Sequence, residues 1–210
     1  MSRNLSAGIL CDTGKPPHLI AAVNGNELNL KSPLFLVGFM CSGKTTLGQS
    51  LARCLDAPYI DLDEAIEQRQ GRTISRIFAE SGEEEFRRVE HSVLNALIAE
   101  TAGSFAVFAL GGGTPCRPGT MEKLNDAGIT VHLDTNIPRF VERLLLGADR
   151  RPLVAGKNEE EITRLVTEML AERNPYYRKA RHTFDSSLLE DEEQINASTQ
   201  RFINTIVRNP

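Results

Sequence analysis

A glycine-rich stretch, Gly38-Phe39-Met40-Cys41-Ser42-Gly43-Lys44-Thr45, matches the pattern GxxxxGK[ST]. Such a loop turns successive main-chain N–H groups toward phosphate oxygens, and the N-terminus of the following helix adds partial positive charge. Lys44 would reach the β- and γ-phosphates of a nucleoside triphosphate, and Thr45 would offer its hydroxyl to Mg²⁺. The motif predicts a nucleotide-binding loop, and a chance glycine turn before a helix is the alternative.

Two carboxylates, Asp61 and Asp63, lie at the end of a strand predicted over 58–63. Side chains two positions apart in an extended strand point to the same face, so we expect these two to lie together. One would hold the magnesium shell, and the other would accept a proton from, or hydrogen-bond to, an attacking hydroxyl. The alternative is that Asp63 only caps the helix that follows.

Three consecutive glycines, Gly111-Gly112-Gly113, directly follow an apolar run at 105–110. Ligands of open parallel sheets bind beyond the carboxyl ends of the strands. Without side chains, these glycines can bring main-chain amides close to an anion, although a plain tight turn is the alternative.

Arginines supply the remaining candidates. Arg150 and Arg151 stand in a glycine-flanked loop at 147–157, which we expect to be mobile and to bring one guanidinium against a transferring phosphoryl group. Arg87 by its position alone is typical of a solvated surface arginine, and Arg173 near a helix end of a residue that favours the helix dipole.

Short apolar runs alternate with helical periodicity from Leu34 onward, which is typical of an α/β protein with a parallel sheet. We expect a helix from a cap at Asn158, paired with Glu161, to 173–175, because Pro175 cannot continue the hydrogen-bond ladder. Other helices are expected after the glycine-rich loop, around 86–98, from Pro138, and over 195–207. The expected strands cover 34–37, 58–63, 105–110, 129–134 and 181–185.

The bulk composition sets limits. A chain of 210 residues fits one globular domain. Its net charge of −4 argues against broad nucleic-acid binding, and no apolar run approaches the roughly 20 residues of a membrane span. The four cysteines show no metal-binding spacing, so we interpret them as reduced thiols of a cytoplasmic protein. Residues 1–33 form an extension, either a small hairpin around Asn24-Gly25 or a flexible tail.

Six phrases, taken together, resemble the shikimate kinase family in order and spacing over residues 34 to about 186: GFMCSGKTTLG, YIDLDEAIE, GRTISRIFAESGEEEFRRVE, ALGGGT, RRPL and ERNPYY. The resemblance implies a three-layer α/β P-loop kinase fold, with a five-stranded parallel sheet flanked by helices and a mobile lid at about 147–157. It implies a domain over 34–210 behind the extension.

The resemblance also implies an activity, in which ATP phosphorylates the 3-hydroxyl of shikimate in chorismate biosynthesis with Mg²⁺ as cofactor. ATP and shikimate would be the partners of a monomer that binds neither nucleic acid nor membranes. Asp63 resembles the residue that binds and helps deprotonate the substrate hydroxyls, whereas Asp61 resembles the one that orders the magnesium shell.

The implied site falls into four sets. The catalytic residues are Lys44, Asp63 and Arg151. The ATP-binding residues are Gly38, Cys41, Ser42, Gly43, Lys44, Thr45, Thr46, Arg143 and Arg151. The substrate-binding residues are Asp63, Arg87, Gly111, Gly112, Gly113 and Arg173, of which Arg87 and Arg173 look like a pair that clamps a carboxylate. The magnesium residues are Thr45 and Asp61.

Two departures from the family pattern stand in the glycine-rich loop, where Cys41 replaces the usual glycine and Phe39 a frequent proline. Two other functions stay open from the residues. A P-loop kinase for gluconate or a nucleoside monophosphate would lack the joint DLD, FRR and GGG pattern. A catalytically silent relative, which binds nucleotide or shikimate as a regulator, would not require Lys44, Thr45, Asp61, Asp63 and Arg151 together.

Overall fold

The structure is a computed structural model that describes residues 31–146 and 153–208. The possible hairpin or tail before residue 31 lies outside the described residues. So do Arg150 and Arg151, and with them most of the predicted lid. The mobile lid therefore stays a prediction.

A five-stranded parallel sheet forms the centre of the molecule, in the order β2-β3-β1-β4-β5, which confirms the predicted architecture. β1 is buried throughout and lies between β3 and β4, as a continuous apolar run predicts for a strand covered on both faces. The strands are β1 (Leu34–Val37), β2 (Tyr59–Asp61), β3 (Val107–Ala109), β4 (Ile129–Asp134) and β5 (His182–Asp185).

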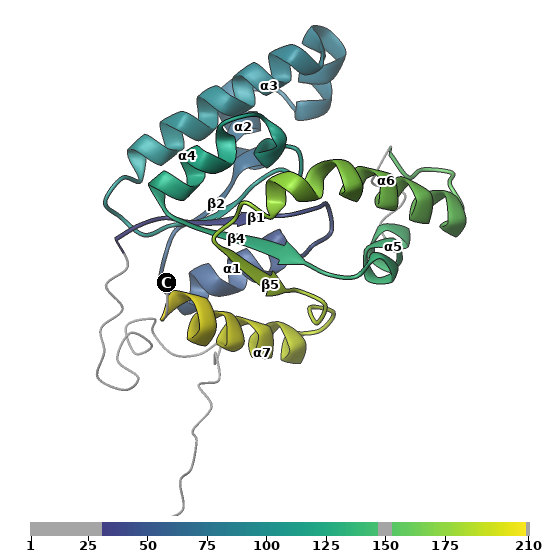
Figure 1. The fold of residues 1–210 in the computed structure, drawn as a ribbon. Coiled ribbons are helices and arrows are strands. Elements are labelled where there is room, and N and C mark those ends of the chain that lie inside the picture. The colour runs from purple at the N-terminus through teal and green to yellow at the C-terminus, as the bar shows by residue number, and fades with distance from the viewer. Residues whose placement is uncertain (1–30, 147–152, 209–210) are drawn as a thin grey trace, which may run out of the picture.

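Helices cover both faces of this sheet (Figure 1). They are α1 (Lys44–Cys54), α2 (Leu62–Gln70), α3 (Ile74–Glu100), the 3₁₀ turn η2 (Thr114–Cys116), α4 (Thr120–Ala127), α5 (Ile137–Leu145), α6 (Glu159–Tyr177) and α7 (Glu192–Phe202), which continues as a π-turn over Ile203–Val207. None of the helices in the described ranges has both the length and the apolar composition needed to cross a membrane.

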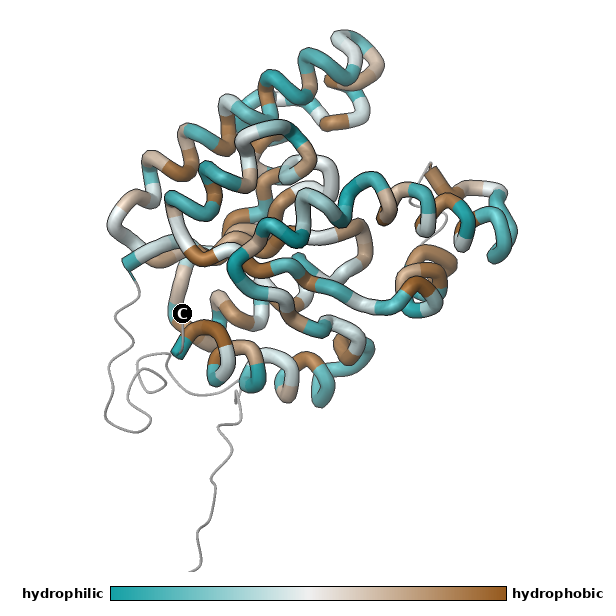
Figure 2. Tube along the Cα trace, in the orientation of Figure 1, coloured by the Kyte–Doolittle hydropathy of each residue, from teal (hydrophilic) through white to brown (hydrophobic). Residues whose placement is uncertain are grey.

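The alternation of side chains along β1 divides the core into two layers. Leu34 and Leu36 pack with α1 and α7 on one face, whereas Phe35 and Val37 pack with α2, α3 and α4 on the other. A third cluster joins Phe39 of the glycine-rich loop to α5 and α6. Figure 2 shows hydrophobic segments gathered along the strands and the inward turns of the helices. The sheet thus holds the carboxyl ends of its strands, where the candidate residues lie, in one fixed frame.

The predicted strand over 58–63 is too long. β2 ends at Asp61, and Asp63 lies in the first turn of α2. The Asp61 carboxylate caps this helix by accepting hydrogen bonds from the main-chain N–H groups of Asp63, at 3.0 Å, and Glu64, at 3.5 Å. The prediction that both carboxylates share one strand face is therefore wrong, because the cap turns the chain between them.

The predicted start of α6 is confirmed and its predicted end is wrong. The Asn158 side chain accepts from the Glu161 N–H at 3.0 Å, and the Glu161 carboxylate accepts from the Asn158 N–H at 2.9 Å. At the other end the helix continues through Pro175 to Tyr177. Proline removes only its own donor, and the Asn174 carbonyl still accepts from the Arg178 N–H at 2.9 Å. The extra turn carries Tyr177 into the interior, where it is fully buried.

The prediction that all four cysteines are reduced is wrong for Cys54, which is disulfide-bonded at the end of α1. Cys41 and Cys116 are not disulfide-bonded. Disulfide formation depends on how closely two cysteines approach in space, which their spacing in the sequence does not show.

Candidate active site

The glycine-rich loop runs from β1 into α1 and folds around its own main chain. Gly38 has a φ of 144°, and a Cβ atom there would lie 2.6 Å from the Leu133 carbonyl oxygen, so only glycine fits. Cys41, at the family's usual glycine position, adopts a φ of 62°, which is uncommon for a residue with a side chain. The loop therefore keeps its left-handed turn with cysteine, at a conformational cost of about 1–2 kcal/mol.

Lys44 lies inside this loop. Its Nζ donates to the carbonyl oxygens of Gly38, at 2.9 Å, and Phe39, at 2.7 Å, and to the Ser42 hydroxyl at 3.4 Å. Burial lowers the pKa of Lys44 to about 8, against the opposing charges of Cys41, Asp63 and Asp61. The ammonium group is thus held by neutral carbonyl groups of the loop. Anionic phosphate oxygens accept stronger hydrogen bonds than these carbonyls and would draw it outward.

A cavity of about 330 Å³ opens beside the loop. It contains every residue of the predicted ATP-binding set except Gly38, Ser42 and Arg151. Gly38 and Ser42 lie within the loop itself, as contacts of Lys44, and Arg151 is outside the described residues. The lining residues are Cys41, Gly43, Lys44, Thr45, Thr46, Arg143, Leu189 and Glu190.

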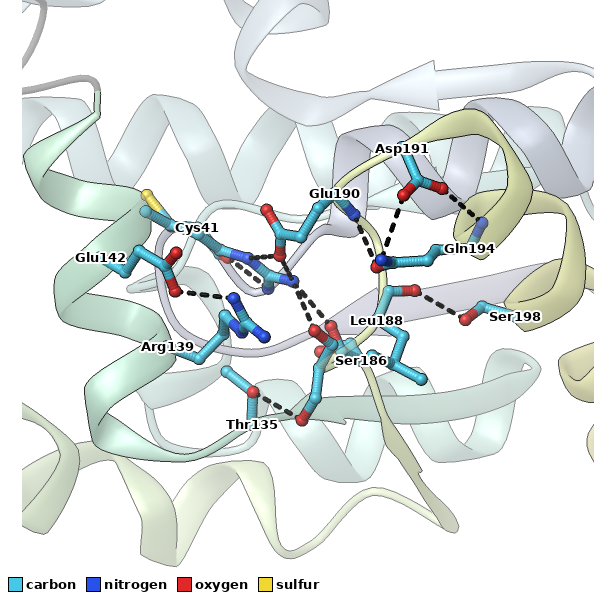
Figure 3. A network of polar contacts seen from close by, with 12 residues as sticks. Cys41, Thr135, Arg139, Glu142, Ser186, Leu188, Glu190, Asp191, Gln194 and Ser198 are labelled. Carbon is cyan, nitrogen blue, oxygen red and sulfur yellow. Dashed lines mark hydrogen bonds and ion pairs between the residues drawn. The ribbon is translucent and has the colours of Figure 1, made fainter.

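Arg143 of α5 ties this cavity together. Its guanidinium donates to the Cys41 carbonyl at 3.2 Å and to the Ser186 carbonyl at 3.0 Å. It also forms an ion pair with Glu190 at 2.7 Å, although its own side chain is only 11% exposed. Figure 3 shows the network around Cys41, Ser186 and Glu190. The arginine thereby fixes the glycine-rich loop against the segment between β5 and α7.

Thr45 and Asp61 meet at Tyr59, which sequence reasoning did not identify. The Tyr59 hydroxyl donates to Asp61 Oδ2 at 3.2 Å, and the Thr45 side chain lies near the same hydroxyl. A hydroxyl and one carboxylate fit Mg²⁺, which retains several waters and takes few ligands from the protein when it binds phosphates. No cluster of three or more His, Cys, Asp or Glu residues suited to a metal occurs in the described part of the chain.

Asp63 faces the glycines that follow β3. Its Oδ1 lies 3.2 Å from where a Cβ atom on Gly111 would stand. Burial, followed by the nearby charges of Asp61 and Glu90, raises the pKa of Asp63 to about 6. A carboxylate with that pKa is ionised near neutrality and still able to take up a proton, as a general base requires.

The two arginines of the predicted clamp converge on one cavity of about 710 Å³, which also exposes Gly113 and Cys116. Arg87 comes from α3 and Arg173 from the end of α6. Arg87 Nη2 lies 2.7 Å from where a Cβ atom on Gly113 would stand, so a side chain there would displace the guanidinium group. The cavity is also lined by Arg88, Arg117 and three carboxylates, those of Glu83, Glu84 and Glu85. Paired guanidinium groups next to glycine main chain form an arrangement for binding an anion.

Glu90 holds Arg87 in place and was not singled out from the sequence. Its carboxylate accepts from Arg87 Nη1 at 2.9 Å and from the Thr114 hydroxyl at 2.6 Å, and its side chain is only 6% exposed. The spacing of Arg87 and Glu90, three residues apart on a helix, is the signal that could have found this pair.

Gly112 lies between the glycine-rich loop and Arg173. A Cβ atom on Gly112 would lie 3.4 Å from the Met40 main-chain nitrogen and 3.5 Å from Arg173 Nη1. The structure therefore places the phosphate loop, Asp63 and the two arginines around the glycines after β3.

Comparisons with known proteins agree with this geometry. A family model described as shikimate kinase matches residues 40–206. The shikimate kinase of Phocaeicola vulgatus is 43% identical over 79% of this chain and 93% of its own length. That of Mycobacterium avium is 45% identical over 69% of this chain and 78% of its own.

Solved structures give the same relationship. A shikimate kinase from Bacteroides thetaiotaomicron has a TM-score of 0.77 and 37% identity, over 82% of this chain and 97% of its own. A shikimate kinase from Acinetobacter baumannii in complex with shikimate has a TM-score of 0.72 and 32% identity, over 87% of this chain and 96% of its own. A gluconokinase from Sinorhizobium meliloti, at 14% identity and a TM-score of 0.50, shares the fold alone.

Proposed function

The chain belongs to the shikimate kinase family, and on that premise we propose that it transfers the γ-phosphoryl group of ATP to the 3-hydroxyl of shikimate. The products are shikimate 3-phosphate and ADP, in aromatic amino-acid biosynthesis. The observation that carries the proposal is the convergence of Arg87 and Arg173 on one cavity, beside Asp63 and the phosphate loop.

The binding residues set the orientation of both substrates. Main-chain N–H groups of residues 38–45 hold the phosphates of ATP, with Lys44 on the β- and γ-phosphates. Arg87 and Arg173 bind the shikimate carboxylate, and the amides of Gly112 and Gly113 complete that contact. A planar guanidinium fixes direction as well as charge, so the 3-hydroxyl faces the γ-phosphorus.

Asp63 accepts the proton of the 3-hydroxyl as that oxygen bonds to the γ-phosphorus and the bond from this phosphorus to the β,γ-bridging oxygen breaks, leaving ADP. With its pKa at about 6, Asp63 is ionised at neutral pH and can act in this way. Thr45 and Asp61 would hold Mg²⁺, which neutralises phosphate charge when bound. Arg151 would contribute a guanidinium from the lid, and Arg143 and Thr46 would contact the nucleoside side of ATP.

We further propose a cytoplasmic monomer that binds neither nucleic acid nor membranes. The net charge of −4 supports the first of these exclusions. Residues 1–33 are proposed as an extension to the kinase domain at 34–210, since the family match begins at residue 40.

The test is an ADP-release assay with ATP and Mg²⁺ and with shikimate, gluconate or nucleoside monophosphates as acceptors. We expect turnover with shikimate alone. Turnover with gluconate or a nucleotide would establish a different kinase. Binding of shikimate without any ADP release would instead establish a catalytically silent relative.

A further inference from the structure

The turn at Gly112 and Gly113 borders the anion cavity through Gly113, and its two main-chain N–H groups have no partner within the described residues. Within the described residues, neither the Gly112 N–H nor the Gly113 N–H donates a hydrogen bond. The neighbouring groups are occupied, since the Gly111 carbonyl accepts from Thr114 N–H at 3.1 Å and the Gly113 carbonyl from Cys116 N–H at 3.0 Å. The two N–H groups are thus the part of this turn that is available to a ligand.

The carbonyl of the same peptide is fixed from behind. The Tyr177 hydroxyl donates to the Gly112 carbonyl oxygen at 2.6 Å. No peptide bond in the described residues is cis, and in a planar trans peptide the N–H points opposite to the C=O. A hydroxyl that fixes the Gly112 carbonyl therefore also fixes the direction of the Gly113 N–H, on the side away from Tyr177.

Tyr177 itself has little freedom to move. Its side chain is fully buried, and its ring packs against His132 of β4 with the centroids 5.2 Å apart. Arg173 lies one helical turn earlier on α6, close enough to Tyr177 for its charge to act on the hydroxyl. The hydroxyl is thus close to both the second arginine of the clamp and the glycine turn. Both are anchored to the sheet through His132.

We propose that Tyr177 is a positioning residue for the acceptor substrate, because its hydroxyl aims the Gly113 N–H at the carboxylate that Arg87 and Arg173 bind. This inference rests on the proposed function, since it takes shikimate as the ligand. Tyr177 does not touch the substrate and acts through the Gly112–Gly113 peptide.

The direct test is Tyr177→Phe, which keeps the ring and its packing on His132 and removes only the hydroxyl. We expect the KM for shikimate to rise about tenfold, which is the cost of one misplaced charge-assisted hydrogen bond. The KM for ATP and kcat should stay within about twofold. The matched control is Tyr176→Phe, which removes a hydroxyl one residue earlier that makes no hydrogen bond within the described chain, and it should change nothing.

A second measurement distinguishes a misdirected Gly113 N–H from a general loss of order in the cavity. The dissociation constants of shikimate and of its methyl ester, which lacks the negative charge, are compared in both proteins with ADP present. We expect the tenfold loss for shikimate and a ratio near one for the ester. A smaller folded fraction would raise both apparent constants by the same factor, so a modest loss of stability leaves the comparison of acid and ester intact.

Two outcomes would overturn the inference: unchanged shikimate affinity in Tyr177→Phe, or equal losses for acid and ester. Absence of shikimate turnover in the unmodified enzyme is a separate result. It would remove the proposed function, whereas the other two outcomes leave that function standing.

Discussion

The nucleotide loop and the anion cavity lie side by side but are built differently. The loop is local, because it consists of eight consecutive residues, and the Lys44 ammonium group donates to two of their own carbonyl groups. The anion cavity draws Arg87 from α3, the glycines from the end of β3 and Arg173 from α6. Backbone binding tolerates side-chain change, whereas a site made from distant side chains depends on each of them and on the residues that hold them.

Asp63 lies where the two regions meet, so its removal should have the largest effect. We expect Asp63→Asn to lower kcat by about 10³-fold, because the general base is lost. The dissociation constant of ATP should stay within about threefold, since the loop is untouched. Glu64→Gln, at an exposed neighbour, is the control. Weakened ATP binding with normal turnover would contradict the role assigned to Asp63.

Loss of either arginine should disable the anion cavity and spare the loop. For Arg87→Ala and Arg173→Ala we expect the KM for shikimate to rise by about 30- to 100-fold, as for other charge-assisted contacts worth roughly 2–3 kcal/mol. ATP affinity should not change. Arg76→Ala is the matched control, because Arg76, also on α3, is 65% exposed, pairs with Glu80 and does not line this cavity. Unchanged shikimate affinity would remove that arginine from the clamp.

The same Asp63→Asn variant should be more stable than the unmodified protein, although its kcat should be far lower. Burial raises the pKa of Asp63 to about 6, so the folded state binds a proton more tightly than the unfolded chain does. The ionised carboxylate therefore destabilises the fold above pH 6, and this cost disappears as the pH falls toward 4.

Because Asp63 is exposed at the surface, solvent screens this charge effect, and we expect the variant to gain at most about 1 kcal/mol in free energy of unfolding near pH 8 and much less near pH 4. Urea unfolding at the two pH values, with ligand absent, measures the difference. A gain that is equal at both would show that the ionisation of Asp63 is not the cause.

The smallest effect is expected in the loop itself, at Cys41→Gly. Glycine adopts the left-handed conformation without strain, which stabilises the fold, but it loses more conformational entropy on folding, which destabilises it. The net change in free energy of unfolding should therefore stay below about 1 kcal/mol. The KM for ATP should stay within about threefold. A tenfold change would show that the Cys41 side chain, and not the main chain alone, shapes the nucleotide site.

The same contrast explains what could be predicted from the sequence. The glycine-rich turn between a strand and a helix, and the alternation of strands and helices, follow from local pattern, and the structure confirms both. The order of the strands within the sheet comes from the structure alone. Convergence of Arg87 and Arg173 followed from the family resemblance, because their own spacing favours ordinary surface roles. Glu90 and Tyr177 were missed, since a positioning residue is defined by what it contacts in space. Tyr177 was missed because the helix was predicted to end at 173–175, whereas α6 continues to Tyr177.

The central place of β1 in the sheet has a consequence for how the chain folds. Leu34 pairs with Val107 on one side and with Ile129 on the other, both far along the sequence. The strand synthesised first among the five must therefore wait for segments that leave the ribosome much later. The entropy of closing such long loops is lost before the strand pairs form, so folding is slow. During that interval the apolar Leu34–Val37 segment is exposed and can aggregate.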